Sequence, residues 1–126
     1  MTNWLLDTNA LIWFFEGSSR VKPILPFFSM KDAKFYISAV SWWEIAIKER
    51  KKGFSFTSAQ LGSFVDMYDF HELPVTREQI RAYKDLPKIH HDPFDHMLLA
   101  QAITCPMRLI TGDAILAEYS SLVMVI

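Results

Sequence analysis

Short apolar segments alternate with longer helical segments along the whole 126-residue chain, and this alternation limits the possible folds more than any other feature. Each short segment is apolar throughout, which is typical of strands that are buried on both faces of a parallel sheet. The predicted strands cover residues 4–7, 35–38, 73–75, 109–111 and 122–126. We therefore expect one α/β domain over residues 1–126, a three-layer α/β/α sandwich around a central, mainly parallel sheet.

Helical periodicity and capping residues predict a helix in most intervals between these strands. Gly17 and Gly53 follow two of the helices, at the position where a left-handed residue commonly ends a helix. The predicted helices cover residues 8–16, 23–30, 41–52, 58–68, 76–85, 92–104 and 113–118.

The composition favours a cytoplasmic protein. Cys105 is the single cysteine, so the chain cannot form an internal disulfide, and a buried thiol is the simplest interpretation of it. We expect no signal peptide and no membrane span, because no apolar run approaches the ~20 residues that a spanning helix requires. A net charge of −1 is not typical of a protein that coats nucleic acid, although an acidic metal centre with a basic rim also averages to neutrality.

Four acidic residues stand near the ends of the predicted strands or the beginnings of the helices that follow. Asp7 ends the first strand, Glu44 opens a helix, Asp95 lies in a first helical turn, and Asp113 follows the fourth strand. In an open parallel sheet, ligands bind beyond the carboxyl ends of the strands. We therefore expect these four carboxylates to meet at one edge of the sheet.

Each acid also has a structural explanation. Asp7, Asp92 and Asp113 stand where the side chain of a helix-capping residue would be, and the helix dipole favours Asp95 in a first helical turn. Ser41 and Glu44 have the spacing of a capping box, in which the glutamate accepts from the serine backbone N–H.

A shared cation explains the conjunction of the four acids better. Converging carboxylates repel one another by about 1 kcal/mol per pair even in water, and a divalent cation offsets that repulsion. Carboxylate oxygens are the ligands that Mg²⁺ prefers. Such ions would activate a water and stabilise the leaving oxygen in the cleavage of a phosphodiester.

Four sequence motifs resemble those of the PIN-domain ribonucleases of the VapC-like toxin group. They read LLDTNALIW at residues 5–13, WEIAIK at 43–48, DPFDHMLLAQA at 92–102 and LITGDAIL at 109–116. The motifs come in the family's order and span nearly the whole chain. The resemblance implies a PIN-like fold and an endoribonuclease that uses Mg²⁺ or Mn²⁺.

The resemblance also assigns roles and partners. It implies that Asp7, Glu44, Asp95 and Asp113 are the catalytic metal ligands. It further implies an RNA substrate cut in an exposed single-stranded loop, a cognate antitoxin that blocks the acids, and a homodimer.

Further residues are expected to support the acids. Under the resemblance, Thr111 holds a water beside the metal, and Asn9 is a polar neighbour of the first aspartate. Asp92 is either a helix cap or an outer ligand, and Lys48 either neutralises the glutamate one turn before it or contacts a phosphate. Gly112 stands where relatives often carry a larger, frequently basic residue, which puts a phosphate contact from that position in doubt.

The histidines and the aromatic residues leave alternatives open. A zinc site is one interpretation of the three neighbouring histidines His90, His91 and His96. The simpler interpretation is that their side chains face solvent. Trp42 and Trp43 are expected in the core. The many large apolar residues of positions 12–15 and 24–28 exceed what one helical face needs. They indicate either a helix pair buried on two sides or an apolar groove for a second copy or a partner peptide.

Other classes of function match the sequence less well. A phosphoacceptor receiver domain needs adjacent acids after its first strand and a late lysine, and a dehalogenase-type phosphatase needs an aspartate where Asn9 stands. A catalytically silent module that binds RNA or protein remains open, since intact ligands do not prove turnover.

Overall fold

The sheet is parallel throughout and lies at the centre of the molecule. The computed structural model describes residues 2–51, 53–88 and 92–126. The strands are β1 (Thr2–Leu6), β2 (Ala33–Ser38), β3 (His71–Leu73), β4 (Arg108–Thr111) and β5 (Val123–Val125). Their spatial order is β3-β2-β1-β4-β5, and every neighbouring pair is parallel.

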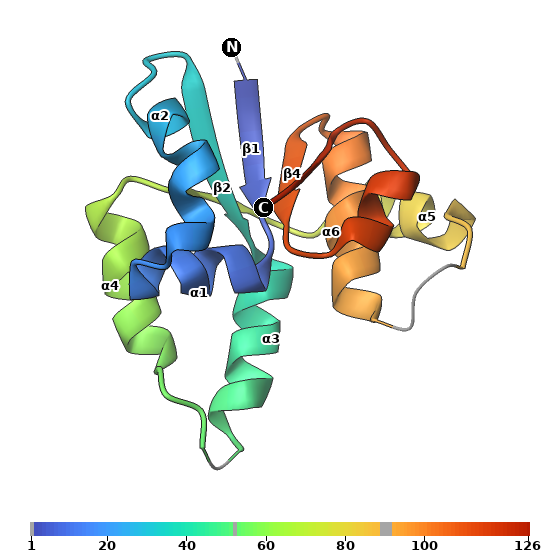
Figure 1. Ribbon diagram of the computed structural model, residues 1–126. Helices are drawn as coiled ribbons and strands as arrows, with labels where there is room; N and C mark the ends of the chain where they lie inside the picture. Colours follow the sequence, from blue (N-terminus) through green and yellow to red (C-terminus); the bar gives the residue numbers. More distant parts are fainter. Residues whose placement is uncertain (1, 52, 89–91) are drawn as a thin grey trace.

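Helices cover both faces of this sheet, which confirms the predicted three-layer arrangement (Figure 1). The α-helices are α1 (Thr8–Glu16), α2 (Leu25–Phe28), α3 (Ala39–Glu49), α4 (Ser58–Met67), α5 (Arg77–Asp85) and α6 (Pro93–Thr104). Two 3-10 helices, η1 (Ser19–Ile24) and η2 (Ala114–Glu118), complete the described elements. In Figure 1, α1, α2 and α4 lie on one side of the strands, and α5 and α6 lie on the other.

The strand order places a topological switch point between β1 and β4. The chain runs outward from β1 through β2 to β3, and then crosses to the other side of β1 to form β4 and β5. The connections on either side of this point leave the carboxyl ends of β1 and β4 in different directions. Open parallel sheets bind ligands in the crevice that this creates. The order also differs from the 2-1-3-4-5 order typical of receiver domains.

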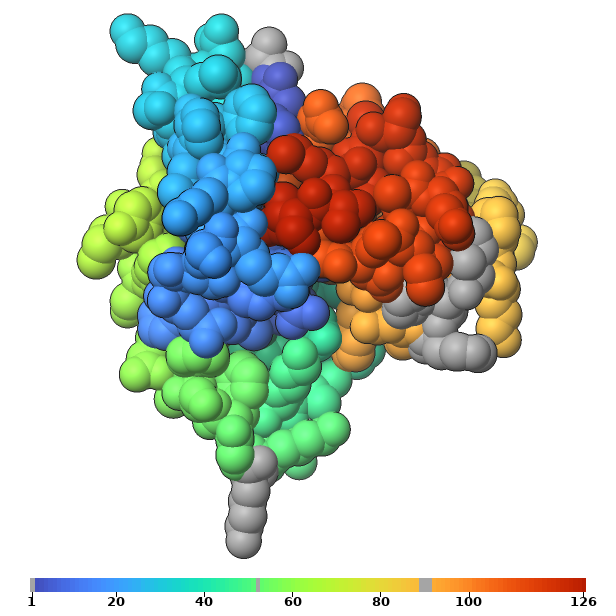
Figure 2. All heavy atoms as spheres, in the orientation of Figure 1, coloured from blue at the N-terminus to red at the C-terminus, as the bar shows by residue number. Residues whose placement is uncertain are grey.

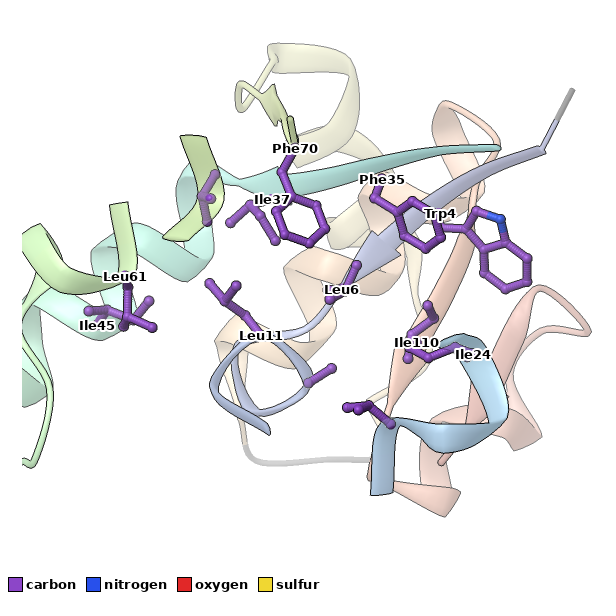
Figure 3. Packing of buried hydrophobic residues seen from close by; sticks show 13 residues of the cluster. Trp4, Leu6, Leu11, Ile24, Phe35, Ile37, Ile45, Leu61, Phe70 and Ile110 are labelled. Carbon is purple, nitrogen blue, oxygen red and sulfur yellow. The ribbon is translucent and has the colours of Figure 1, made fainter. Parts of the chain in front are cut away.

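Alternating residues of the strands supply two separate cores. One core contains Trp4 and Leu6 of β1 together with Ile37 and Ile110, and α1, η1 and α4 cover it (Figure 3). The other contains Leu5 of β1, which is fully buried and packs with residues of α6. A strand that is buried on both faces explains the uninterrupted apolar character of its sequence.

Several helix boundaries differ from those predicted. The helix that carries Glu44 begins at Ala39 and is capped by the Ser38 hydroxyl, so the predicted capping box of Ser41 and Glu44 is wrong. Ser41 is buried inside the helix, and Glu44 lies in its middle. The physical reason is that the hydroxyl directly at the strand end reaches the first free N–H groups before Ser41 does.

Other differences are smaller. The helix predicted at 23–30 is divided between η1 and α2, and the one predicted at 113–118 is a 3-10 turn. Residue 52, the predicted end of the third helix, lies outside the described residues. No helix within the described ranges combines the length and the apolar character needed to cross a membrane.

The prediction that both adjacent tryptophans are core residues is wrong for one of them. Trp42 is partly buried against the first core, whereas the side chain of Trp43 is 63% exposed. Successive helical residues are about 100° apart around the axis, so neighbouring side chains on a helix that covers one sheet face cannot both point inward. Cys105 is half-buried rather than fully buried.

Candidate active site at the carboxyl edge of the sheet

Asp7 occupies the switch point between the first and fourth strands. Its backbone N–H donates to the Ile110 carbonyl at 3.0 Å, which continues the pairing of β1 with β4 by one residue. The side chain caps α1, since Oδ1 accepts from the backbone N–H of Ala10 at 2.7 Å. The capping role predicted from sequence is confirmed. Capping uses only one of the two carboxylate oxygens of Asp7, and the second oxygen points to β4.

The Asp7 carboxyl is buried, with 3% of the residue exposed. The pKa of this carboxyl is raised from 3.8 to about 6, mainly because it is buried, and the negative charge of Glu44 acts in the same direction. Hydrogen bonds from the Thr111 hydroxyl and from the backbone N–H groups of Ala10 and Gly112 act in the opposite direction. The net direction shows that the surroundings supply less stabilisation for the ionised carboxylate than water would.

Thr111 joins the first aspartate to the fourth acid of the predicted set. The fully buried Thr111 hydroxyl donates to Oδ2 of Asp7 at 2.6 Å and accepts from the backbone N–H of Asp113 at 3.0 Å. The Asp113 side chain in turn caps η2 by accepting from the N–H of Ile115 at 3.0 Å. Asp7, Thr111 and Asp113 therefore form one hydrogen-bonded connection across the ends of β1 and β4.

Glu44 reaches the same region from α3. Its side chain is 15% exposed and forms an ion pair with Lys48, with 3.4 Å between Oε2 and Nζ. This confirms the helical ion pair expected from the spacing of the two residues. The negative charge of Glu44 raises the pKa of Asp7, so the two carboxyl groups are near enough to interact electrostatically.

Asp95 and Asp92 lie together in the first turn of α6. Asp92 is the helix cap and accepts from the N–H of Phe94 at 2.9 Å and from that of Asp95 at 3.4 Å. The capping interpretation of Asp92 is thus confirmed. Asp95 is partly buried and stands at the third position of the helix.

The four acids are not gathered into a closed metal site. Within the ranges that the structure describes, no three His, Cys, Asp or Glu side chains lie together as an ion would require. Asn9 is exposed on the first turn of α1. His90 and His91 lie outside the described residues.

His96 is buried, so the expectation of solvent-facing histidines is wrong for it. Its ring centroid lies 6.2 Å from that of Tyr83 and 6.3 Å from that of Tyr119. The His96 side chain therefore packs between α5 and the residue that follows η2, because α6 turns this position away from solvent.

A buried polar network that the sequence analysis did not single out ties the acid-bearing helices together. The Ser38 hydroxyl donates to Oε1 of Gln101 at 2.6 Å, and Nε2 of Gln101 donates to Oε1 of Gln79 at 3.0 Å. Ser38 stands at the start of α3, Gln101 belongs to α6 and Gln79 to α5, and all three residues are buried. Gln101 lies inside a strongly apolar helix, and that contrast is the signal by which it could have been found.

Two hollows have mainly apolar linings. The first has a volume of about 390 Å³, lies between α1, α2 and α4, and is lined mainly by Phe14, Leu25, Phe28 and Phe64. Most of the large apolar residues of positions 12–15 and 24–28 pack against the first core, and some of them also line this hollow. The second hollow has a volume of about 420 Å³ and includes the exposed Trp43.

Comparison with known proteins identifies the fold and the family. The profile of the PIN domain matches residues 4–122. The VapBC2 complex of Rickettsia felis, bound to a DNA fragment from its promoter, aligns with a TM-score of 0.77 and 14% identity, covering 99% of this chain and 98% of that chain.

Two further solved structures are similar. A toxin–antitoxin complex from Klebsiella pneumoniae aligns with a TM-score of 0.69 and 21% identity over 95% of this chain and 94% of that chain. VapBC-1 of nontypeable Haemophilus influenzae aligns with a TM-score of 0.68 and 16% identity over 99% and 97%. A comparison with curated protein sequences gives no match. At these identities the solved structures share the fold, and because the family profile covers nearly the whole sequence, the chain belongs to the PIN domain family.

Proposed function

We propose that this PIN domain is a Mg²⁺- or Mn²⁺-dependent endoribonuclease and the toxin of a toxin–antitoxin pair. The observation that carries the proposal is the carboxylate of Asp7, which is buried at the switch point of the sheet and joined through Thr111 to Asp113. An ionised group in such a position is costly unless something of opposite charge accompanies it. No cationic side chain among the described residues forms an ion pair with Asp7.

The chemistry of the acids fits a hard divalent cation. Asp7, Glu44, Asp95 and Asp113 offer carboxylate oxygens, which Mg²⁺ and Mn²⁺ prefer over nitrogen or sulfur ligands. A cation beside Asp7 would offset both its burial and the repulsion from Glu44. Since these side chains do not form a closed site as they lie, binding requires them to turn toward Asp7, and Glu44 to exchange Lys48 for the ion.

A bound divalent ion would supply the positive charge that polarises a phosphodiester and makes a neighbouring water more acidic. The residues of the chain supply orientation. Ala10 and Thr111 each hold one oxygen of the Asp7 carboxylate, so the group cannot rotate freely. Thr111 also holds the backbone of Asp113, which fixes the distance between the ends of β1 and β4.

The decisive experiment is a cleavage assay on single-stranded and hairpin RNA with Mg²⁺, with Mn²⁺ and with EDTA. The variants Asp7→Asn and Asp95→Asn are expected to lose activity by about 100-fold or more, because each removes an anionic ligand. Asp66→Asn is the control, since Asp66 is an exposed acid of α4. A folded wild-type protein that does not cleave RNA with either metal would overturn the proposal.

An antitoxin is the partner that we propose for the hollow between α1, α2 and α4. The hollow is lined by aromatic and aliphatic side chains, with Lys22 at its border, which suits an apolar peptide segment that carries an acidic residue. The similar solved structure from Klebsiella pneumoniae is a toxin–antitoxin complex, which supports a protein partner for this chain. We expect that overproduction of the chain alone arrests bacterial growth and that Asp7→Asn removes the arrest. Unimpeded growth with soluble, active protein would contradict the toxin role.

A homodimer is the second assembly that we propose. The exposed apolar side chains of Trp43, Val75 and Ile80 surround the second hollow together with Phe94 and Met97. A contiguous apolar surface of this kind is typical of an interface.

A catalytically silent PIN domain that binds RNA or protein is the alternative function. One observation favours it: within the described residues the acids do not form a closed metal site. The cleavage assay separates the two functions, because a silent module would bind RNA without metal-dependent turnover. The receiver-type alternative has no support, since both the strand order and the family differ from it.

A further inference from the structure

The side chain of Trp13 fills the space where a side chain on Gly112 would lie, directly beside Asp113. Gly112 lies between Thr111 and Asp113, and its backbone N–H helps to lower the pKa of the Asp7 carboxylate. A Cβ atom on Gly112 would overlap Cη2 of Trp13 and lie 2.9 Å from Cζ3. The indole of α1 therefore packs against the backbone that joins two of the candidate site residues.

Arg20 of η1 is stacked on this tryptophan. Its Cζ atom lies 3.9 Å from the centroid of the Trp13 ring, which is within the range of a cation–π contact. Its Nη2 atom would be 3.3 Å from a Cβ on Gly112 and donates to the Ile126 carbonyl at 3.0 Å. Contacts with the N-terminal helix and with the end of the chain thus hold the guanidinium in place. Figure 2 shows the blue N-terminal helices against the red C-terminal segment.

In this position, the guanidinium of Arg20 can still bind an anion. Arg20 is exposed. Of the five N–H donors of its guanidinium, one donates to the Ile126 carbonyl within the described residues. The planar fork of an arginine matches the oxygens of a phosphate, and stacking on an aromatic ring orients the fork in advance. An RNA strand whose scissile phosphate reaches Asp7 carries further phosphates on either side, and Arg20 stands next to that path.

We propose that Arg20, seated on Trp13, binds a backbone phosphate of the RNA strand adjacent to the phosphodiester that is cut. This inference rests on the proposed function and adds a substrate-binding residue outside the acid motifs. Because it contacts a phosphate rather than a base, the residue contributes affinity for any RNA sequence. The competing explanation is that Arg20 only reduces the negative charge of the acids, which would change metal binding rather than RNA binding.

The experiment compares Arg20→Gln with Arg108→Gln in the wild-type background. Arg108 is a matched control, because it also lies over a tryptophan, with 5.3 Å from its Cζ atom to the ring of Trp4, but stands at the opposite end of β4. For Arg20→Gln we expect KM for RNA to rise about tenfold with kcat little changed, and the slope of log KM against log salt to fall by about 1. Arg108→Gln is expected to leave both quantities unchanged, and the Mg²⁺ concentration for half-maximal cleavage should not move in either variant.

Two further variants keep the inference testable if Arg20→Gln does not fold. Arg20→Lys retains the positive charge without the planar guanidinium, and Trp13→Leu removes the aromatic ring on which the guanidinium is stacked. Both are expected to raise KM by about threefold, less than Arg20→Gln does.

The outcomes separate this inference from the proposed function. Unchanged KM and salt dependence in an active Arg20→Gln protein would overturn the role of Arg20 and leave the nuclease intact. An equal effect of Arg20→Gln and Arg108→Gln would also overturn it, because general charge would then explain the result. A wild-type protein that neither binds nor cleaves RNA would overturn both.

Discussion

At the scale of single residues, Asp7 combines two requirements that conflict in the absence of a cation. The carboxylate must cap α1 and face β4, and both tasks place it in the interior. Burial disfavours its ionised form, which is why its pKa rises to about 6. A residue kept ionisable in such surroundings is typical of a functional position rather than of a structural one.

The raised pKa predicts how stability depends on pH without metal. Between pH 4 and 6 the folded protein binds a proton at Asp7 that the unfolded chain, with a pKa of 3.8, has already released. The free energy of unfolding should therefore fall as pH rises through this window, by up to about 3 kcal/mol at about 1.4 kcal/mol per pKa unit, and this contribution should be level above pH 6. Urea denaturation in EDTA, compared between wild type and Asp7→Asn, measures it.

In Asp7→Asn this contribution disappears, and the variant should be more stable than wild type at pH 7. If the two proteins show parallel stability curves across the window, the Asp7 carboxyl is not the buried group that the geometry indicates. A difference that persists only with Mg²⁺ present would contradict the prediction as well.

Thr111 is predicted to act through its hydroxyl alone. Thr111→Val keeps the shape but removes the donor to Asp7 and the acceptor for the Asp113 N–H. Leaving these buried groups without partners should cost about 2 kcal/mol of unfolding free energy at pH 7. Thr111→Ser should recover most of it. Equal stability of the valine and serine variants in urea denaturation would show that the hydroxyl does not matter.

At the scale of elements, buried side chains connect the helices that carry the acids. Ser38 ends β2, caps α3 and donates to Gln101 of α6, and Gln101 continues to α5 through Gln79. A polar network of this kind holds helices in one relative position, because each shift would leave a buried polar group without a partner. The network thereby fixes α3, which carries Glu44, relative to α6, which carries Asp95.

Ser38→Ala should therefore be more costly than the loss of an ordinary helix cap. The variant loses both the bond to the Val40 N–H and the bond to Gln101, and we expect a cost of about 2–3 kcal/mol. Thr57→Ala is the matched control, because Thr57 caps α4 at the surface and its loss should cost about 1 kcal/mol. Thermal or urea denaturation measures both. A cost for Ser38→Ala no larger than that of the control would mean that the network adds nothing.

At the scale of the whole molecule, the fold separates three surfaces. Asp7, Asp113 and Arg20 lie at the carboxyl ends of β1 and β4. The first hollow lies between α1, α2 and α4, and the second is lined by residues of α3, α5 and α6. RNA, an antitoxin and a second copy could thus each contact a different part of the surface.

We predict that the apolar surface around the second hollow forms the interface of the homodimer. Ile80→Glu places a charge in the middle of the exposed apolar side chains and should convert a dimer to a monomer in sedimentation velocity experiments. Met67→Glu is the control, since Met67 is a highly exposed apolar residue of α4 outside this surface. A monomeric wild type would contradict the dimer, and a dimeric Ile80→Glu protein would place its interface elsewhere.

Much of the fold could be predicted from the sequence because its signals are local. The span of α1 is recovered, with Asp7 as its cap and Gly17 in the left-handed conformation that ends it. Apolar strand segments between helices predicted a parallel sheet covered on both faces, and the order of elements confirmed it. Prediction was wrong where two local signals competed. Ser38 and Ser41 are both suitable caps for α3, and only the position of the strand end decides between them.

The sequence by itself determined the alternation of strands and helices and the position of each acid next to a strand or helix end, since backbone preferences and caps act over a few residues. Only the tertiary structure decided which strand lies beside β1, and hence that Asp7 faces Thr111. It also decided that Arg20 reaches Gly112, that Trp43 is exposed, and that no three of the described acids come together in one cluster. These outcomes depend on how whole elements pack, and packing joins residues whose separation along the chain carries no local signal.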